Sequence, residues 1–248
     1  MFPIRDSVLR THPPLVVYGI ILANSLAFFY EISLGEDASV DLLYRYALVP
    51  ARYFRPDWAA AHGLSANDYL PFLTNTFLHG GWLHIILNLW VLYIFGPALE
   101  DRLGGARFAA LYLLAGIAAS FTHAVFNANS TAPTLGASGA IAGIIAAYAV
   151  RFPTAWVTLV IPIFIFPFFF NVPAVLFAGL WFLMQLISGF SALAMPGAGG
   201  GIAWWAHAGG FIAGGMLLLM LDPRHAALPV HRGSETGEGP WSRRGPWG

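Results

Sequence analysis

The sequence contains no cysteine, and all twelve of its basic residues are arginine. Without cysteine the chain can form no disulfide, no thiolate metal site and no cysteine nucleophile. Twelve acidic residues balance the arginines, so the net charge is zero and there is neither a basic groove nor a Lys-rich tract to carry nucleic acid. Nucleic-acid binding is therefore excluded, and any covalent chemistry must use oxygen or nitrogen.

Charged residues are scarce as well. They make up 10% of the sequence and hydrophobic residues make up 58%, whereas a typical soluble domain carries about 25% charged residues. Asp, Glu, Lys and Arg are all absent from the stretch between Phe152 and Leu221, which no ordinary soluble fold would leave uninterrupted. The composition predicts a multi-pass integral membrane protein whose main solvent is the lipid bilayer.

Long apolar runs give the expected architecture. A helix that spans a membrane needs about 20 mostly apolar residues, and six segments meet or approach that length. They are residues 14–31, 82–99, 107–126, 137–151, 173–191 and 202–221. We expect an all-α membrane protein in which residues 14–221 form a six-transmembrane-helix bundle.

Two connections between these segments have a distinct composition. The stretch between the first two spans holds scattered charged and aromatic residues, which predicts a large first extracytoplasmic loop folded against the membrane surface. The apolar run at 154–171 contains Pro162 and Pro167 and is followed by Pro173. Three prolines argue against a straight seventh span, so we expect an interfacial connector there.

The arginines predict the orientation in the membrane. Arg45, Arg52 and Arg55 fall on one side of the six-helix arrangement, and the other nine of the twelve fall on the opposite side. Cytoplasmic segments carry the excess of arginine, so the 1–13 tail and the 222–248 tail are both expected in the cytoplasm. The second tail is rich in Gly, Pro and Arg and is expected to be disordered. Helices two, four and six then begin at the outer face.

Three groups of residues in the spans are unusual for helices that only face lipid, because buried polar groups are costly in a membrane. They are His79, His84 and Asn88 at the start of helix two, Gly136, Ser138 and Gly139 at the start of helix four, and His207, Gly210 and Gly214 in helix six. At about 1.5 Å per residue, their polar atoms would share one depth, about 5 to 10 Å below the outer surface.

This shared depth predicts acyl-transfer chemistry. Ser138 supplies a nucleophile, His207 a general base, and the side-chain donors of helix two can stabilise an oxyanion. No carboxylate lies in a span near that depth to orient His207, so we expect a Ser-His dyad. Taken singly, Ser138 is more typical of a packing residue, and His207 could equally be a polar residue satisfied between helices. His123 fits no motif, and we expect a structural role for it.

The glycines predict close packing of helices four and six. Gly139 and Gly143, like Gly210 and Gly214, are small residues at a spacing of four, which lets two helices approach each other. Such an approach would bring Ser138 within hydrogen-bond reach of the histidine. The glycines around the serine leave room for a substrate backbone, and the start of helix four offers free N–H groups.

Taken together, the patterns H-x4-H-x3-N, G-x-S-G and A-H-x-x-G-x-x-x-G make the chain resemble the rhomboid family of intramembrane serine proteases, in its basic six-helix bacterial form, over roughly residues 14–221. The resemblance implies that Ser138 attacks the scissile carbonyl and that His207 takes its proton. It implies that His84, Asn88 and the Ser138 N–H form the oxyanion hole and that His79 is structural.

The resemblance also raises expectations at other positions. Glu100 is expected to cap the cytoplasmic end of helix two. Ala142 stands where some members carry a Tyr that stacks on the histidine, so Trp204 or Trp205 becomes a candidate to hold that ring. The glycine-rich segment 193–201 is expected to form a mobile cap over the site.

The family implies a serine endopeptidase of the bacterial cytoplasmic (inner) membrane that cuts transmembrane segments of other proteins near the outer face, without metal or organic cofactor. An alternative is a catalytically silent rhomboid-like protein that binds or escorts transmembrane clients, although the serine and the histidine are both present. A small transporter is disfavoured because the sequence has no internal repeat and no carboxylate in the middle of a span. The oligomeric state is left open.

Overall fold

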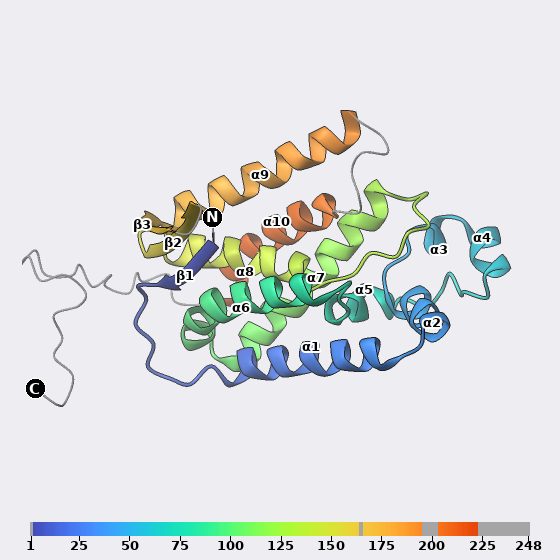
Figure 1. Ribbon diagram of the computed structural model, residues 1–248, viewed down its shortest axis with the longest axis horizontal. Coiled ribbons are helices and arrows are strands. Elements are labelled where there is room, and N and C mark those ends of the chain that lie inside the picture. The colour runs from blue at the N-terminus through green and yellow to red at the C-terminus, as the bar shows by residue number, and fades with distance from the viewer. Residues whose placement is uncertain (1, 164–165, 195–202, 223–248) are drawn as a thin grey trace, which may run out of the picture.

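The computed structural model describes residues 2–163, 166–194 and 203–222. Its long helices pack side by side (Figure 1). They are α1 (Leu15–Ser33), α6 (Trp82–Leu103), α7 (Gly105–Phe126), α8 (Ser138–Arg151), α9 (Ala174–Ala194) and α10 (Trp204–Leu221). Each coincides with one of the expected spans to within a few residues, because apolar run length controls where these helices begin and end.

Four of these helices, α1, α6, α7 and α10, are long and apolar enough to cross a membrane. Of the other two, α8 is a shorter apolar helix, and α9 is apolar over its Ala174–Ser188 part. The expected count of six spans therefore stays a prediction. A helix of 14 residues such as α8 rises only about 21 Å, so if it lies across the bilayer it must begin or end below a membrane surface.

The centre of the bundle is α8, in which every residue from Gly139 to Ala149 is buried. It packs most extensively against α10, and α7 covers both of them. A Cβ on Gly210 would collide with the carbonyl oxygen of Gly139, and one on Gly214 would collide with the backbone of Gly143. Lipid gives little hydrophobic drive between helices, so this close backbone packing supplies much of their attraction.

Between α1 and α6 the chain forms a set of short helices at one end of the bundle (Figure 1). These are α2 (Glu36–Tyr46), α3 (Ala51–Phe54), α4 (Pro56–Ala61), α5 (Pro71–Thr74) and the 3-10 turn η1 (Asn75–Phe77). Arg52 holds them together, since its buried guanidinium donates to the carbonyl of Ser65 at 2.8 Å and to the carboxylate of Asp68 at 2.7 Å. These short helices lead directly into α6.

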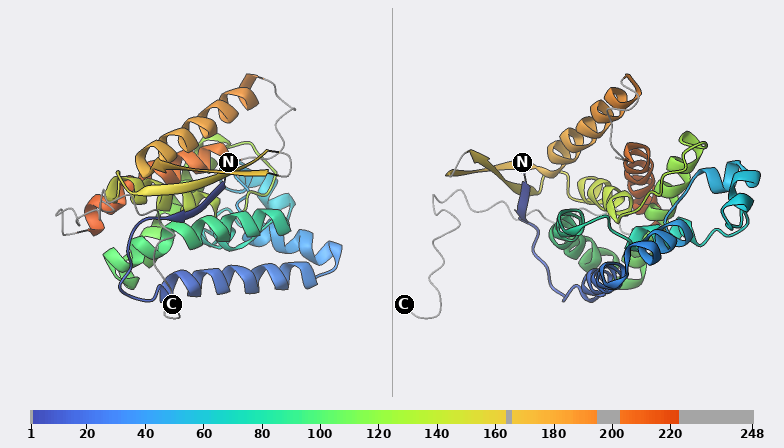
Figure 2. Two further views of the ribbon diagram at one scale, coloured as in Figure 1. Left: turned by 60° about the vertical axis from the view of Figure 1, so that its left-hand side comes forward. Right: turned by 45° about the vertical axis from the view of Figure 1, so that its right-hand side comes forward.

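The expectation of an all-α chain is wrong at the opposite end. Residues predicted as a cytoplasmic tail and as an interfacial connector form an antiparallel sheet in the order β1-β2-β3. Its strands are β1 (Phe2–Asp6), β2 (Trp156–Ile163) and β3 (Phe166–Pro173). Pro162 pairs with Pro167 beyond the part of β2 that pairs with β1, where a missing N–H costs little. The β2–β3 hairpin projects from the end of the bundle (Figure 2).

The role expected for Glu100 is also corrected. Its carboxylate does not cap the helix that carries it. It accepts hydrogen bonds from the backbone N–H groups of Val16 at 2.9 Å and Val17 at 2.8 Å, at the start of α1. Helix N-termini leave such N–H groups without partners, and the residue before α1 is Pro14, which has no side-chain acceptor. Glu100 therefore joins the end of α6 to the start of α1.

Two expectations fall outside the described part of the chain. The predicted disordered tail at 222–248 lies outside it except for Asp222, and the predicted cap at 193–201 lies outside it except for the end of α9.

Candidate functional site

Ser138 and His207 meet at the contact between α8 and α10. Ser138 is the first residue of α8, and His207 lies in the first turn of α10. The serine Oγ is 2.8 Å from the histidine Nε2, although 69 positions separate the two residues. The glycine contacts between these helices explain the distance, because they allow the two backbones to touch. The hydroxyl thus lies within hydrogen-bond distance of an imidazole nitrogen, as nucleophilic catalysis by a serine would require.

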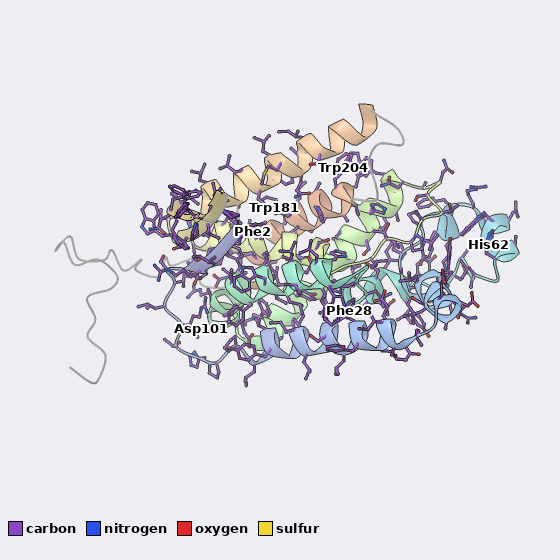
Figure 3. The ribbon with its side chains drawn as sticks, in the orientation of Figure 1. Phe2, Phe28, His62, Asp101, Trp181 and Trp204 are labelled. Carbon is purple, nitrogen blue, oxygen red and sulfur yellow. The ribbon has the colours of Figure 1, made fainter. Side chains whose placement is uncertain are left out.

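The edge of the His207 ring that faces away from Ser138 contacts α9. Its Nδ1 lies 2.8 Å from Oε1 of Gln185, and the ring is tilted against Trp181 with 5.9 Å between the centroids. The expected holder, Trp204 or Trp205, is not what contacts the ring. Those two indoles lie against each other at 3.7 Å, and Trp205 also stacks on a phenylalanine of α7. Figure 3 shows Trp181 on α9 and Trp204 near the start of α10.

Gln185 is the residue that sequence reasoning missed. A signal for it existed, because it is the only amide or ionisable side chain in α9. A lone polar side chain in an apolar helix needs a partner. Its partner could not be read from spacing, since 22 positions and a change of helix separate Gln185 from His207.

His84 and Asn88 lie one turn apart on α6 and face Gly136, two residues before Ser138. A Cβ on Gly136 would lie 2.7 Å from Nε2 of His84 and 3.8 Å from Nδ2 of Asn88. Gly136 also has φ of +122°, a conformation that L residues with a side chain rarely adopt. Both the space and the backbone conformation therefore require glycine at this position.

The amide of Asn88 carries an unused donor. Asn88 is 8% exposed, and its Nδ2 has no hydrogen-bond partner among the residues that the structure describes. A buried donor without a partner costs about 1–3 kcal/mol, so proteins rarely retain one. One recognised exception is a donor aimed at a place where charge develops in a reaction.

His79 lies behind His84. It is buried, its backbone N–H donates to the carboxylate of Glu31 at 3.1 Å, and its ring meets the His84 ring edge-on at 5.1 Å. Burial, and secondly the neighbouring His84, lower the pKa of His79 to about 4, so the ring is neutral at neutral pH. His79 thus contacts His84 and the end of α1, and the structural role expected for it stays a prediction.

A small cavity of about 20 Å³ adjoins Ser138. Several of the side chains that line it are polar and form hydrogen bonds with one another. Asn75 donates to Ser120 at 2.9 Å, and His123 is 3.0 Å from the hydroxyl of Thr134. A cavity of this size has room for about one water molecule. His123, expected to be structural, thus has a hydrogen-bond partner and also lines the space beside the serine.

A second cavity, of about 320 Å³, lies between α6 and α9. Its walls include Gln185 of α9 and Phe2 and Pro3 of β1, and the remaining lining residues are apolar. A larger hollow of about 870 Å³ is bordered by α5, α7 and α10 and shares no residue with the polar cluster. Within the described ranges, no group of three or more His, Asp or Glu side chains is placed to hold a metal ion.

The family model of the Rhomboid domain matches residues 66–224. That range is more than half of the chain and contains the whole polar cluster around Ser138 and His207. The chain belongs to the rhomboid family. The resemblance drawn from the three sequence patterns is thereby confirmed.

Named relatives agree with this membership. The chain is 33% identical over 153 residues to the rat (Rattus norvegicus) presenilin-associated rhomboid-like protein, mitochondrial, and this match covers 60% of this chain and 37% of that protein. It is 30% identical over 132 residues to RHOMBOID-like protein 6, mitochondrial, of Arabidopsis thaliana, covering 48% of this chain and 42% of that protein. The zebrafish (Danio rerio) presenilin-associated rhomboid-like protein A, mitochondrial, matches at 32% over 116 residues, covering 46% and 30%.

The chain thus spans between 30% and 42% of the length of these relatives. All three are named as mitochondrial. They give no support to the predicted bacterial cytoplasmic membrane, which stays a prediction.

Proposed function

We propose that this rhomboid is an intramembrane serine endopeptidase that cleaves transmembrane segments of other membrane proteins near the outer membrane face. The observation that carries the proposal is the 2.8 Å contact between Ser138 Oγ and His207 Nε2. Packing alone would not need a hydroxyl and an imidazole nitrogen at this distance at the junction of two apolar helices.

The first half of the reaction forms an acyl-enzyme. Ser138 Oγ attacks the carbonyl carbon of the scissile bond while its proton passes to Nε2 of His207. The carbonyl oxygen becomes an oxyanion in a tetrahedral intermediate. When this intermediate collapses, the C–N bond breaks and His207 returns the proton to the leaving amine. The acyl group stays on Ser138 as an ester.

The oxyanion would be held by donors from two helices. Asn88 supplies its unused Nδ2–H, His84 supplies a ring N–H, and Ser138 supplies its backbone N–H at the start of α8. Gly136 lets the two α6 side chains come close to this point. Such donors act strongly in a water-poor site, where removing one typically costs about 10²- to 10³-fold in kcat.

The second half of the reaction needs one water molecule. His207 takes a proton from that water, the hydroxide attacks the ester carbon, and the proton returns to Ser138 Oγ as the acid product leaves. The water-sized cavity beside Ser138 is a suitable reservoir, since its polar walls include Ser120 and His123. No metal or organic cofactor takes part in this scheme.

The substrate must present an extended peptide bond to Ser138. In a helix each peptide group is bonded within the helix and shielded by side chains, so the segment has to unwind locally before attack. Helix-destabilising Gly or Pro near the cut site would lower that cost. We place both termini of the rhomboid on the cytoplasmic side, which puts the starts of α6, α8 and α10 near the outer face.

The test is cleavage of a model transmembrane substrate in liposomes, comparing the wild type with Ser138→Ala and His207→Ala. Ser25→Ala is the matched control, because Ser25 also sits in an apolar helix but bonds only to the carbonyl of Ile21. We expect turnover by the wild type and the control and none by the two site variants. Equal cleavage by the wild type and either site variant would contradict the dyad.

A fluorophosphonate probe separates the protease from the catalytically silent alternative. Such a probe labels a serine only when a base activates it. We expect labelling of the wild type and none of Ser138→Ala. A wild type that binds a transmembrane client but neither labels nor cleaves would be an escort instead.

A further inference from the structure

The side of His207 that faces away from Ser138 is occupied by α9. This helix is apolar from Ala174 onward, and Gln185 is its only amide or ionisable side chain. The side-chain oxygen of Gln185 lies 2.8 Å from Nδ1 of His207, within hydrogen-bond distance. An amide in an apolar helix is costly without a partner, and here its partner is the proposed base.

The contact has a consequence for the proton on the ring. A neutral imidazole carries one proton, on either Nδ1 or Nε2. To accept the proton of Ser138, Nε2 must be free, so the proton must sit on Nδ1. The oxygen of Gln185 at Nδ1 accepts a hydrogen bond from that N–H and therefore favours the one form of His207 that can act as base.

Gln185 also fits the surroundings better than a carboxylate would. Placing a charged group among apolar helices carries a large desolvation cost, while a neutral amide carries a smaller one. Trp181 lies one turn earlier on α9 and contacts the same imidazole at 5.9 Å between ring centroids. The α8 position that could have carried an aromatic neighbour is Ala142. Two side chains of α9 therefore hold the ring from one direction.

We propose that Gln185 is the positioning residue of the dyad, holding His207 in the required tautomer and orientation from a third helix. The proposal rests on the proposed peptidase activity. It also gives α9 a direct part in activity, because a displacement of α9 away from α10 would remove the acceptor from Nδ1 without moving Ser138.

The test uses Gln185→Leu, which removes the acceptor at similar size, and Gln185→Glu, which keeps an oxygen there. Leu183→Ala is the matched control, since Leu183 is on the same helix but exposed and outside the cluster. For each variant kcat and KM are measured with the model transmembrane substrate in liposomes, together with the rate of fluorophosphonate labelling and the melting temperature. The labelling rate reports activation of Ser138 without docking of a transmembrane segment.

For Gln185→Leu we expect kcat and the labelling rate to fall together, by about 10- to 100-fold, with KM and melting temperature close to those of Leu183→Ala. Gln185→Glu should recover part of the labelling rate relative to Gln185→Leu, because its oxygen can again accept the Nδ1–H, while the desolvation cost of a carboxylate keeps the recovery incomplete. Loss of activity in Gln185→Leu through KM alone, with labelling unchanged, would show that the residue serves substrate docking and would overturn the proposal.

Other outcomes are also decisive. Wild-type labelling and turnover in Gln185→Leu would mean that His207 needs no partner at Nδ1. If Gln185→Leu proves unstable, Gln185→Asn gives the same information, because its amide is one methylene shorter and stops short of the ring. Full activity in that variant would sink the idea. If the wild type neither reacted with the fluorophosphonate probe nor cleaved the substrate, the proposed peptidase function itself would be contradicted.

Discussion

The ring of His84 lies directly over Gly136, so close that a Cβ on the glycine would come within 2.7 Å of the ring nitrogen Nε2. Two separate constraints meet at this glycine, since its φ of +122° also excludes side chains. The loop before Ser138 therefore packs closely against the first turns of α6.

Gly136→Ala should lower kcat more than 100-fold, because the methyl group displaces His84 and strains the backbone next to the nucleophile. The measurement is turnover of the model substrate together with the melting temperature. Gly80→Ala is the control: it lies in the same region, but its Cβ would meet its nearest neighbour at an ordinary 3.9 Å. Normal kcat in Gly136→Ala would mean that the position of His84 is unimportant for catalysis.

Asn88→Ala should separate activity from stability. If Nδ2 is kept free for an oxyanion, its removal should lower kcat by about 10²- to 10³-fold with little change in KM. The melting temperature should stay the same or rise, since a buried donor without a partner costs about 1–3 kcal/mol in the folded state. Steady-state kinetics and thermal unfolding check the two parts.

The control for that variant is Asn24→Ala. The Nδ2 group of Asn24 is buried too, but unlike that of Asn88 it donates to a partner, the carbonyl of Ile20 within α1. We expect Asn24→Ala to lose stability and keep its kcat. If Asn88→Ala behaved in the same way, the amide of Asn88 would be a structural group.

Two neighbouring glycines on α10 offer a matched pair. A Cβ on Gly214 would run into the backbone of Gly143, whereas a Cβ on Gly215 would meet its nearest atom at 3.9 Å. Gly214→Ala should therefore destabilise the protein by about 1–3 kcal/mol and lower activity, because α10 must move away from α8 and take His207 with it. Gly215→Ala should change neither. Unfolding midpoints and labelling rates in one detergent compare the pair, and identical behaviour would contradict a tight α8–α10 contact.

The helices and most of the site were predictable from the sequence because each left a local signal. The length of the apolar runs located all six long helices. Isolated polar residues within those runs marked the candidate site. The spacing of His84 and Asn88 placed them on one face of α6, and the paired glycines indicated the contact that brings Ser138 to His207. Local periodicity was enough for these features.

The features that were missed depend on partners far along the chain. The carboxylate of Glu100 looked like a cap for its own helix, but the unpaired N–H groups that it meets begin 84 positions earlier, at Val16. Gln185 carried a polarity signal, yet nothing local named His207 as its partner. The β2–β3 hairpin has apolar residues on both faces, so it lacks the alternation that identifies a strand at a surface. Its prolines argued against a helix but did not predict a strand.

The N-terminal strand supplies a prediction about pH. Asp6 lies where β1 meets α8: it accepts a hydrogen bond from the hydroxyl of Tyr148 at 2.9 Å and pairs with Arg10 at 2.7 Å. Burial raises the pKa of Asp6 above its ordinary range, although Arg10 and Tyr148 act in the opposite direction. The folded protein therefore holds the Asp6 proton more tightly than the unfolded chain does.

The sign of the effect follows from that difference. The contribution of Asp6 to stability is largest at low pH, where both states are protonated, and it falls as pH rises from the ordinary Asp pKa through the raised one. Asp6→Asn cannot titrate, so its melting temperature should decline less than that of the wild type over this acidic window. Asp41→Asn is the control, because Asp41 forms an exposed pair with Arg45 and should leave the wild-type pH dependence intact. The measurement is thermal unfolding across the acidic range. If the wild type gained stability relative to Asp6→Asn as pH rises, the ion pair with Arg10 would lower the pKa of Asp6 more than burial raises it.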